Sequence, residues 1–180
     1  MPDIKFGTDG WRARIAEDYT FENVRRVAQG FAQYLLDQGH DGTWVVVGYD
    51  KRFQSEAFAQ AAAEVLAGSG LRVYLTDRAT PTPIISYSVV AKKAVGGVNI
   101  TASHNPPQYN GLKLVGDGAL PLSGEAGMPE LLRRVQAARE LPPVPGTARR
   151  DRVDLYDDYV RHLHAFVDVG ALAPYRVVMD

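Results

Sequence analysis

Helical and strand-like hydrophobic patterns alternate along the first part of the chain. Between residues 20 and 36, apolar side chains recur every three or four positions, the spacing of one face of an α-helix. Thr20 is suited to cap the start of this helix, and Gly39 to follow its end. The apolar face consists of Phe21, Val24, Val27, Phe31 and Leu35. Residues 44–48 are then continuously apolar, a pattern typical of a parallel strand that is covered on both faces.

Two further strand–helix units follow. We predict a second helix with Ser55 as its N-cap, and a third that starts with Thr82 as N-cap and Pro83 in its first turn and runs through Val90. Strands are predicted at 71–75, 95–100 and 112–115, and a strand pair near the start of the chain at 4–6 and 11–15. Repeated strand–helix–strand units imply right-handed crossovers and hence a three-layer α/β sandwich.

The pattern changes beyond residue 120. Leu131, Leu132 and Val135 indicate one more amphipathic helix, which the Pro/Gly-rich residues 141–147 cannot continue. We interpret that stretch as an extended connector and place the main domain at 1–150. A helical pattern at 153 to about 167 predicts a connecting helix within 151–174. Residues 176–179 are predicted to start a strand that has almost no chain left to pair with, which suggests a fragment of a longer protein.

The composition excludes several classes of function. The chain has 180 residues, of which 46% are hydrophobic and 23% charged, enough to bury a core of its own. It has no cysteine, which excludes disulfides, thiol catalysis, Cys-ligated zinc and iron–sulfur clusters. Twenty Lys and Arg against 21 Asp and Glu give a net charge of −1, without the basic excess that nucleic-acid binding requires.

Targeting and membrane segments are not evident in the sequence. No apolar stretch approaches the roughly 20 residues needed to cross a bilayer, and the N-terminus lacks the apolar core of a secretion signal. We therefore expect a soluble, cytoplasmic protein that binds neither nucleic acid nor membranes.

The most informative segment lies between the strands predicted at 95–100 and 112–115. It reads Thr101-Ala102-Ser103-His104-Asn105-Pro106-Pro107-Gln108-Tyr109-Asn110-Gly111-Leu112-Lys113. Ligands of α/β proteins bind at the carboxyl ends of strands, where this loop begins, and its two prolines restrict its shape. A serine beside a histidine, with amides and a lysine nearby, offers an acceptor oxygen, a proton shuttle and charge for phosphoryl transfer. The same residues also suit a polar turn, and composition alone does not decide between the two.

Four motifs, in order, carry a resemblance to a known family. Thr101-Ala102-Ser103-His104-Asn105-Pro106 resembles the phosphoserine signature of the α-D-phosphohexomutases, the superfamily of phosphoglucomutase, phosphomannomutase and phosphoglucosamine mutase. The other three are Phe6-Gly7-Thr8-Asp9-Gly10-Trp11-Arg12, Gly48-Tyr49-Asp50-Lys51-Arg52 and Tyr109-Asn110-Gly111-Leu112-Lys113. The resemblance covers essentially the whole chain as the first of four domains, with 175–180 similar to the start of the second. It implies the fold of domain I, a three-layer α/β/α sandwich with a mostly parallel mixed sheet.

The resemblance also implies roles for individual residues. Ser103 carries the phosphoryl group, and His104, Lys113 and Arg12 act with it as acid/base, orienting or cationic groups. The residues implied to bind substrate phosphate are Arg12, Arg52, Asn105 and Lys113, with Arg52 on the loosest match. Without the resemblance, Arg12 and Lys113 would be interpreted as ordinary surface cations and His104 as a neutral capping histidine.

Cofactors and partners are implied in the same way. Mg²⁺ would be bound through the phosphate of Ser103 and shared with an acidic Asp-Gly-Asp-type loop of the second domain, which this sequence lacks. A glucose 1,6-bisphosphate-type compound would be the activator. Domains II–IV of the same chain would complete the site for a hexose phosphate, so the isolated fragment is expected to be inactive. The sequence does not distinguish glucose, mannose and glucosamine phosphates.

The function that we expect is that of the serine-bearing N-terminal domain of a phosphohexomutase. Such an enzyme interconverts hexose 1-phosphate and hexose 6-phosphate through a phosphoserine and a bisphosphorylated sugar. Two alternatives remain open. A phosphatase would use Ser103 as a transient nucleophile and release inorganic phosphate, whereas a non-catalytic module would only bind a phosphosugar.

Overall fold

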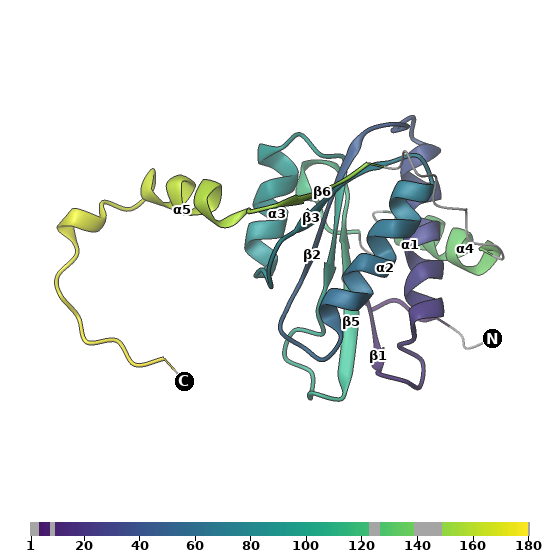
Figure 1. Cartoon of the computed structure of the whole chain (residues 1–180), viewed down its shortest axis with the longest axis horizontal. Helices are drawn as coiled ribbons and strands as arrows, with labels where there is room; N and C mark the ends of the chain where they lie inside the picture. The colour runs from purple at the N-terminus through teal and green to yellow at the C-terminus, as the bar shows by residue number, and fades with distance from the viewer. Residues whose placement is uncertain (1–3, 8–9, 123–126, 139–148, 180) are drawn as a thin grey trace.

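The chain folds around one six-stranded mixed sheet with helices on both faces (Figure 1). The structure is a computed structural model that describes residues 4–7, 10–122, 127–138 and 149–179. The strands are β1 (Gly10–Arg14), β2 (Trp44–Tyr49), β3 (Arg72–Thr76), β4 (Gly96–Ile100), β5 (Tyr109–Val115) and β6 (Arg150–Val153). The helices are α1 (Phe21–Leu36), α2 (Ser55–Gly68), α3 (Thr82–Ala91), α4 (Met128–Ala137) and α5 (Tyr156–His164).

The strand order is β1-β5-β4-β2-β3-β6. Strands β4, β2, β3 and β6 run parallel to one another, while β5 is antiparallel to both of its neighbours. Helices α1, α2 and α4 enclose the larger core on one face, and α3 packs on the other face with a smaller core. The predicted three-layer α/β/α sandwich with a mostly parallel mixed sheet is therefore confirmed.

Helix α1 forms as its hydrophobic spacing predicts. Thr20 is its N-cap, with Oγ1 accepting a hydrogen bond from the Asn23 backbone N–H at 3.2 Å. The four apolar positions from Val24 to Leu35 are buried in the larger core, where α1 packs against α2 and α4. One stretch of sequence thus provides both the start signal of the helix and the face by which it packs.

Both of the other predicted caps are wrong. Ser55 and Thr82 are the first residues of α2 and α3, and the cap positions belong to Gln54 and Pro81. The two hydroxyls face inward: Ser55 Oγ donates to Asp50, and Thr82 Oγ1 accepts from Asn99. Other side chains have taken the place of the capping bond in both cases, while the proline in the first turn of α3 is confirmed.

The predicted edges of the sheet also need correction. Residues 4–6 form no strand, and β1 pairs with β5 because Trp11 and Ala13 can then enter the core. The edge strand β6 was not predicted, because its alternating charged side chains lack a hydrophobic pattern. The helix that follows is shorter than predicted, at 156–164, and residues 176–179 form no strand because they pair with none of the strands in the described ranges.

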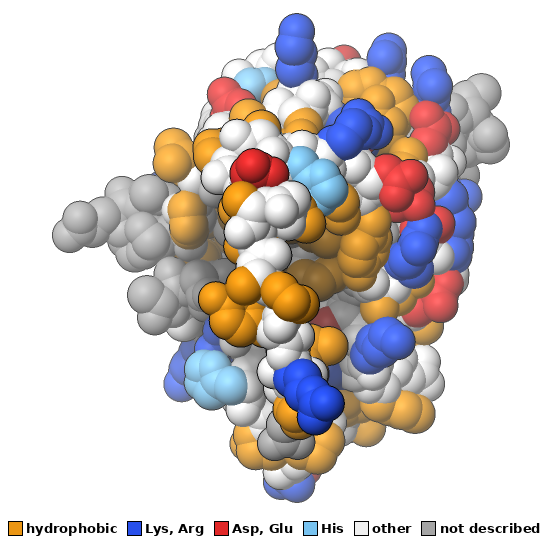
Figure 2. Space-filling model, turned by 90° about the vertical axis from the view of Figure 1, so that its left-hand side faces the viewer, with side chains coloured by type: hydrophobic (Ala, Val, Ile, Leu, Met, Phe, Trp, Pro, Cys, Tyr) orange, Lys and Arg blue, Asp and Glu red, His pale blue; other side chains and the backbone are white. Residues whose placement is uncertain are grey.

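The C-terminal part of the described chain projects away from the sandwich (Figure 1). Helix α5 contacts α3, where the rings of Tyr87 and His162 stack at 4.4 Å. Beyond α5, hydrophobic side chains such as Phe166, Tyr175 and Val178 are exposed, and Figure 2 shows the molecule from this side. The connector predicted at 141–147 lies outside the described residues, and the division into domains stays a prediction.

None of the helices in the described ranges has the length and apolar character that crossing a lipid bilayer requires.

A buried tyrosine connects α1's entry loop to β5, next to the loop that leaves β4. Tyr19 stacks on Trp11 at 4.9 Å, and its hydroxyl donates to the Gly111 carbonyl oxygen at 2.7 Å. Burial, together with the charge of Asp50, raises the pKa of Tyr19 well above its ordinary value. The folded state therefore holds Tyr19 as a neutral hydrogen-bond donor.

We predict that Tyr19→Phe lowers the free energy of unfolding by about 1 kcal/mol at pH 7, the typical net value of such a hydrogen bond. Because the pKa of Tyr19 is raised on folding, its contribution is complete below about pH 10 and is lost at higher pH, where the unfolded phenol ionises first. Urea unfolding should show a smaller difference in the free energy of unfolding between Tyr19→Phe and the parent near pH 11 than at pH 7. A difference that is the same at both pH values contradicts the prediction, and the exposed Tyr175→Phe variant is the control.

Candidate functional site

Ser103 lies in the loop that leaves the carboxyl end of β4, and it is exposed to solvent. Its backbone is in the left-handed region, with φ of 56°. Non-glycine residues rarely adopt this conformation, which costs on the order of 1 kcal/mol or more. The Ser103 backbone N–H donates to Thr101 Oγ1 at 3.0 Å. The conformation is thus stabilised locally, and the hydroxyl is presented outward.

His104 is the neighbour of the serine hydroxyl. Its Nδ1 atom lies 3.4 Å from Ser103 Oγ, and both side chains are exposed. Asn105, which follows, is half-buried and donates its backbone N–H to the Ala102 carbonyl at 3.1 Å. The three polar residues expected in the loop therefore lie together at its tip.

The guanidinium of Arg52 binds the inner side of this loop. Arg52 lies between β2 and α2, and its Nη1 and Nη2 atoms donate to four backbone carbonyls. These belong to Ser103, Asn105, Pro106 and Tyr109, at 2.7, 2.6, 3.0 and 3.1 Å respectively. Its Nε lies 3.4 Å from Asp50 Oδ2. The expectation that Arg52 binds substrate phosphate stays a prediction.

A buried polar network connects Arg52 to strand β5. Asp50 Oδ1 accepts from the Arg52 backbone N–H at 2.9 Å and from Ser55 Oγ at 2.8 Å. Asn110 Nδ2 donates to Ser55 Oγ at 2.9 Å, and Asn110 Oδ1 accepts from the Gly111 N–H at 2.8 Å. Both Ser55 and Asn110 are buried. The network therefore runs from the loop through α2's start to the strand that follows the loop.

Arg12 and Lys113 lie on neighbouring strands and on the same face of the sheet. In the β1–β5 register, Gly10 is opposite Lys113, and Arg12 is opposite Gly111. Positions two apart on a strand share a face, so the two cations are diagonal neighbours. Their strand partners are glycines, and a Cβ on Gly111 would lie 2.9 Å from Arg12 Cγ. The absence of a side chain at Gly111 thus leaves room for Arg12 beside the serine loop.

Lys113 also lines a pocket of about 170 Å³ on the α3 side of the sheet. Thr82, Ser86 and Asn99 are among its other lining residues. Asn99 Nδ2 donates to Thr82 Oγ1 at 2.7 Å, while its buried Oδ1 has no hydrogen-bond partner within the part of the chain that the structure describes. The pocket places polar groups beside Lys113.

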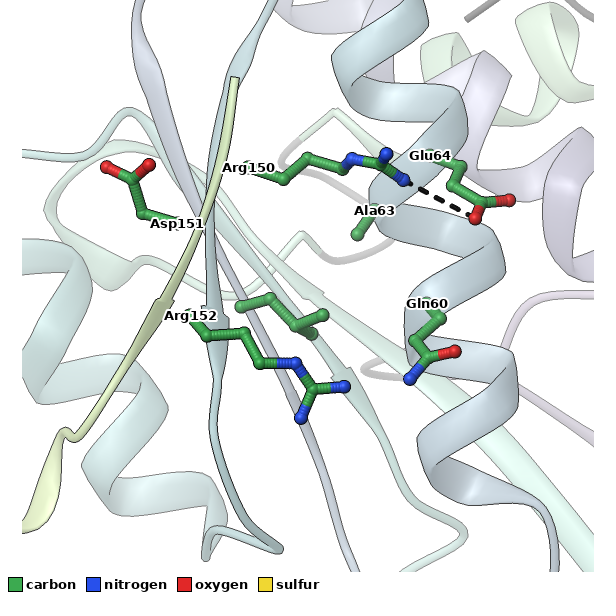
Figure 3. Close-up of a pocket in the computed structure, with 7 residues that line it drawn as sticks. Gln60, Ala63, Glu64, Arg150, Asp151 and Arg152 are labelled. Carbon is green, nitrogen blue, oxygen red and sulfur yellow. Dashed lines mark ion pairs between the residues drawn. The ribbon is translucent and has the colours of Figure 1, made fainter. Parts of the chain in front are cut away.

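A second pocket, of about 310 Å³, lies at the β6 edge of the sheet (Figure 3). Arg150 and Arg152 point from β6 toward α2, where they pair with Glu64 and Glu56 at 3.4 and 3.0 Å. Asp151 points to the other side of the strand. In the sheet order, β2 and β3 separate β6 from β4, so this pocket is distinct from the serine loop. Its cations are already neutralised by their ion-pair partners.

The described residues do not provide a metal site on their own. Across these ranges, no group of three or more His, Asp or Glu side chains is placed to hold an ion. The carboxylate nearest in the network to the serine loop, Asp50, is engaged by Arg52 and Ser55. That Mg²⁺ is bound through a phosphate on Ser103 and shared with a second domain stays a prediction.

The structure gathers the expected site residues around the β4–β5 loop and the adjoining face of β5 and β1. Thr8 and Asp9, which belong to the first motif, lie outside the described residues. The supporting roles of Asp50 and Asn110 were not predicted from the sequence. A carboxylate directly after a buried strand is a recognisable signal for Asp50, whereas nothing local marks Asn110 as the partner of Ser55.

Comparison with known proteins connects these motifs to one family. Residues 3–141 match the family model described as phosphoglucomutase/phosphomannomutase, alpha/beta/alpha domain I. A phosphomannomutase of Salmonella montevideo is 34% identical over 171 residues, covering 94% of this chain and 36% of its own length. A phosphoglucomutase of Staphylococcus epidermidis is 41% identical over 126 residues, covering 68% of this chain and 23% of its own.

A solved structure agrees with the sequence matches. It is a protein of Thermus thermophilus that carries a provisional phosphomannomutase name, and it is 39% identical with a TM-score of 0.78. The alignment covers 94% of this chain and 37% of that protein. The matches to the Salmonella and Thermus proteins include most of this chain. The chain therefore spans about a third of the length of these relatives.

The left-handed backbone at Ser103 gives a prediction about stability. Ser103→Gly should be more stable than Ser103→Ala by about 0.5–1 kcal/mol, because glycine adopts a positive φ without steric cost while alanine does not. Both variants lack the hydroxyl, so the comparison isolates the backbone. Thermal or urea unfolding of the two variants measures it. An alanine variant as stable as the glycine variant would show that the serine backbone is not strained.

Proposed function

Because the chain belongs to the phosphoglucomutase/phosphomannomutase family through its domain I, we propose that it is the serine-bearing part of a hexose-phosphate mutase. The proposed enzyme interconverts hexose 1-phosphate and hexose 6-phosphate through a phosphoserine at Ser103. The observation that carries the proposal is the exposed Ser103 hydroxyl, held in a left-handed loop at the carboxyl end of a strand. Relatives named for mannose and for glucose both match, so the hexose is left open.

The proposed reaction has two transfers. In the first, a sugar hydroxyl attacks the phosphorus on Ser103, a new P–O bond forms to the sugar, and the bond to Ser103 Oγ breaks. The attacking hydroxyl gives its proton to His104, while Lys113, as a cation, orients the transferring phosphoryl group. His104, whose Nδ1 lies 3.4 Å from Oγ, returns a proton to the departing serine oxygen. The bisphosphorylated sugar then transfers its other phosphoryl group to Ser103 by the reverse chemistry, so the net reaction is an isomerisation.

Charge supports this assignment of roles. A phosphoserine carries about −1.5 to −2 charges at neutral pH and needs cations nearby. Arg12 and Lys113 share a sheet face beside the loop, and we propose that they and the side chain of Asn105 bind phosphate oxygens. Mg²⁺, when bound through the serine phosphate, would supply further neutralisation. Its remaining ligands, a bisphosphorylated activator and the sugar-binding groups are proposed to involve other parts of a longer protein, so the isolated chain should have no mutase activity.

The first test is the position of the phosphoryl group. We predict that a longer protein containing this chain, treated with a hexose bisphosphate, gains one phosphoryl group on Ser103 by intact mass and peptide mapping. The Ser103→Ala variant should gain none and lose mutase turnover. Phosphate on another residue only, or full turnover in Ser103→Ala, would rule out the proposal. Steady release of inorganic phosphate from many esters, without isomerisation, would favour the phosphatase alternative.

A second test concerns proton transfer. In the same longer protein, His104→Gln and Lys113→Met should each lower turnover by roughly 10²–10⁴-fold, which is typical for the loss of a positioned acid, base or charge-stabilising group. Circular dichroism should show that both variants remain folded. The matched control is Lys93→Met, an exposed lysine between α3 and β4. Turnover equal to the parent in both variants would mean that neither residue takes part in the reaction.

A further inference from the structure

The guanidinium of Arg52 has all of its donors directed at protein acceptors. An arginine side chain carries five N–H donors in a planar fork. Three point at backbone carbonyls of the serine loop and one at that of Tyr109, where β5 begins, and Nε faces Asp50. The side chain is only 16% exposed. A phosphate could bind Arg52 only by displacing these contacts, which argues against Arg52 as a phosphate ligand.

The loop itself explains why it needs such a partner. Pro106 and Pro107 have no backbone N–H, so the segment has fewer donors than carbonyl acceptors. Within residues 101–109, two internal backbone bonds are present, from the N–H of Asn105 to Ala102 and from that of Tyr109 to Pro106. Four carbonyl oxygens that converge on one point repel one another unless a cation lies between them. Arg52 supplies that cation, and its planar fork fits the four oxygens.

Arg52 is in turn anchored to the strand that follows the loop. Asp50 holds the backbone N–H of Arg52, Ser55 Oγ donates to Asp50, and Asn110 Nδ2 donates to Ser55. The contacts therefore close a ring that starts at Ser103, passes through residues 50–55, and returns to β5 directly after the loop. The left-handed backbone of Ser103 lies inside this ring, with its carbonyl bonded to Nη2.

We propose that Arg52 is a positioning residue that fixes the backbone of the serine loop, and that it acts on phosphoryl transfer through Ser103 rather than by binding phosphate. The part that concerns phosphoryl transfer rests on the proposed function. The part that concerns the loop does not, because the four carbonyl contacts belong to this chain alone. Lysine cannot replace Arg52, because its single ammonium group keeps the charge but not the planar fork.

The first experiment measures the loop directly. Amide hydrogen exchange is followed in the 180-residue chain and in its Arg52→Lys, Arg52→Met and Lys51→Met variants. The amides of Asn105 and Tyr109 should exchange about 10-fold faster or more in both Arg52 variants, as expected when charge-assisted hydrogen bonds are lost. Amides of β2 should be unchanged. Lys51→Met removes the neighbouring exposed charge and should behave like the parent.

Each other outcome overturns the proposal. Loop exchange in Arg52→Lys equal to the parent would show that charge alone suffices. If amide exchange became faster by the same factor in the loop and in β2, Arg52 would stabilise the whole fold and not the loop in particular. Ser55→Ala provides a milder variant that leaves Arg52 intact, and it should accelerate the same two loop amides by a smaller factor. If Ser55→Ala left the exchange of the two loop amides unchanged, the ring of contacts through Ser55 would not anchor the loop.

The second experiment separates positioning from phosphate binding. In the longer enzyme of the proposed function, Arg52→Lys and Arg52→Met should lower kcat by about 10-fold or more to a similar extent, with little change in KM. A raised KM with partial rescue by lysine would instead identify a phosphate ligand. If Ser103 of the unchanged protein never takes up phosphate, the proposed function fails, while the exchange experiment still decides the role of Arg52 in the loop.

Discussion

Three carbonyl oxygens of the loop after β4 and that of Tyr109, the first residue of β5, converge on the guanidinium of Arg52, and the local structure around Ser103 depends on this contact. A loop with two prolines has fewer backbone donors than acceptors, and a left-handed serine has a steric cost of about 1–2 kcal/mol that its contacts must offset. The sheet provides this support because Asp50 follows β2, which is the parallel neighbour of β4. The carboxyl ends of the two strands therefore bring Arg52 and the loop together. The exposed hydroxyl of Ser103 is a consequence of this arrangement.

The periodic parts of the fold could be predicted from the sequence, because burial determines both the spacing and the element. Helix α1 is the clearest case: its cap and its apolar positions are local signals, and both are confirmed. The caps assigned to Ser55 and Thr82 failed because Asp50, five residues before Ser55, and Asn99, on β4, engage the two hydroxyls. Strand β6 was missed because an edge strand with exposed charges on its sides needs no hydrophobic alternation.

The candidate site divides in the same way. Ser103, His104 and Asn105 are contiguous, so the sequence could identify them together, and the register of β1 with β5 brings Arg12 beside Lys113. The partners of the loop were not predictable from local patterns. The link between Asn110 and Ser55 joins residues 55 positions apart, and the contacts of Arg52 span a similar separation. Only the packed sheet reveals that these side chains organise the loop.

The role proposed for Ser103 depends on one property of the unliganded protein, namely that the serine loop is already fixed before any substrate binds. Preorganisation of this kind reduces the cost of bringing the reacting oxygen into position. The most direct measurement is the backbone angle of Ser103 in solution, from NMR scalar and residual dipolar couplings of the unliganded protein. The account predicts a single conformation with φ near the 56° of the structure. Couplings averaged over several conformations, or a negative φ, would contradict it.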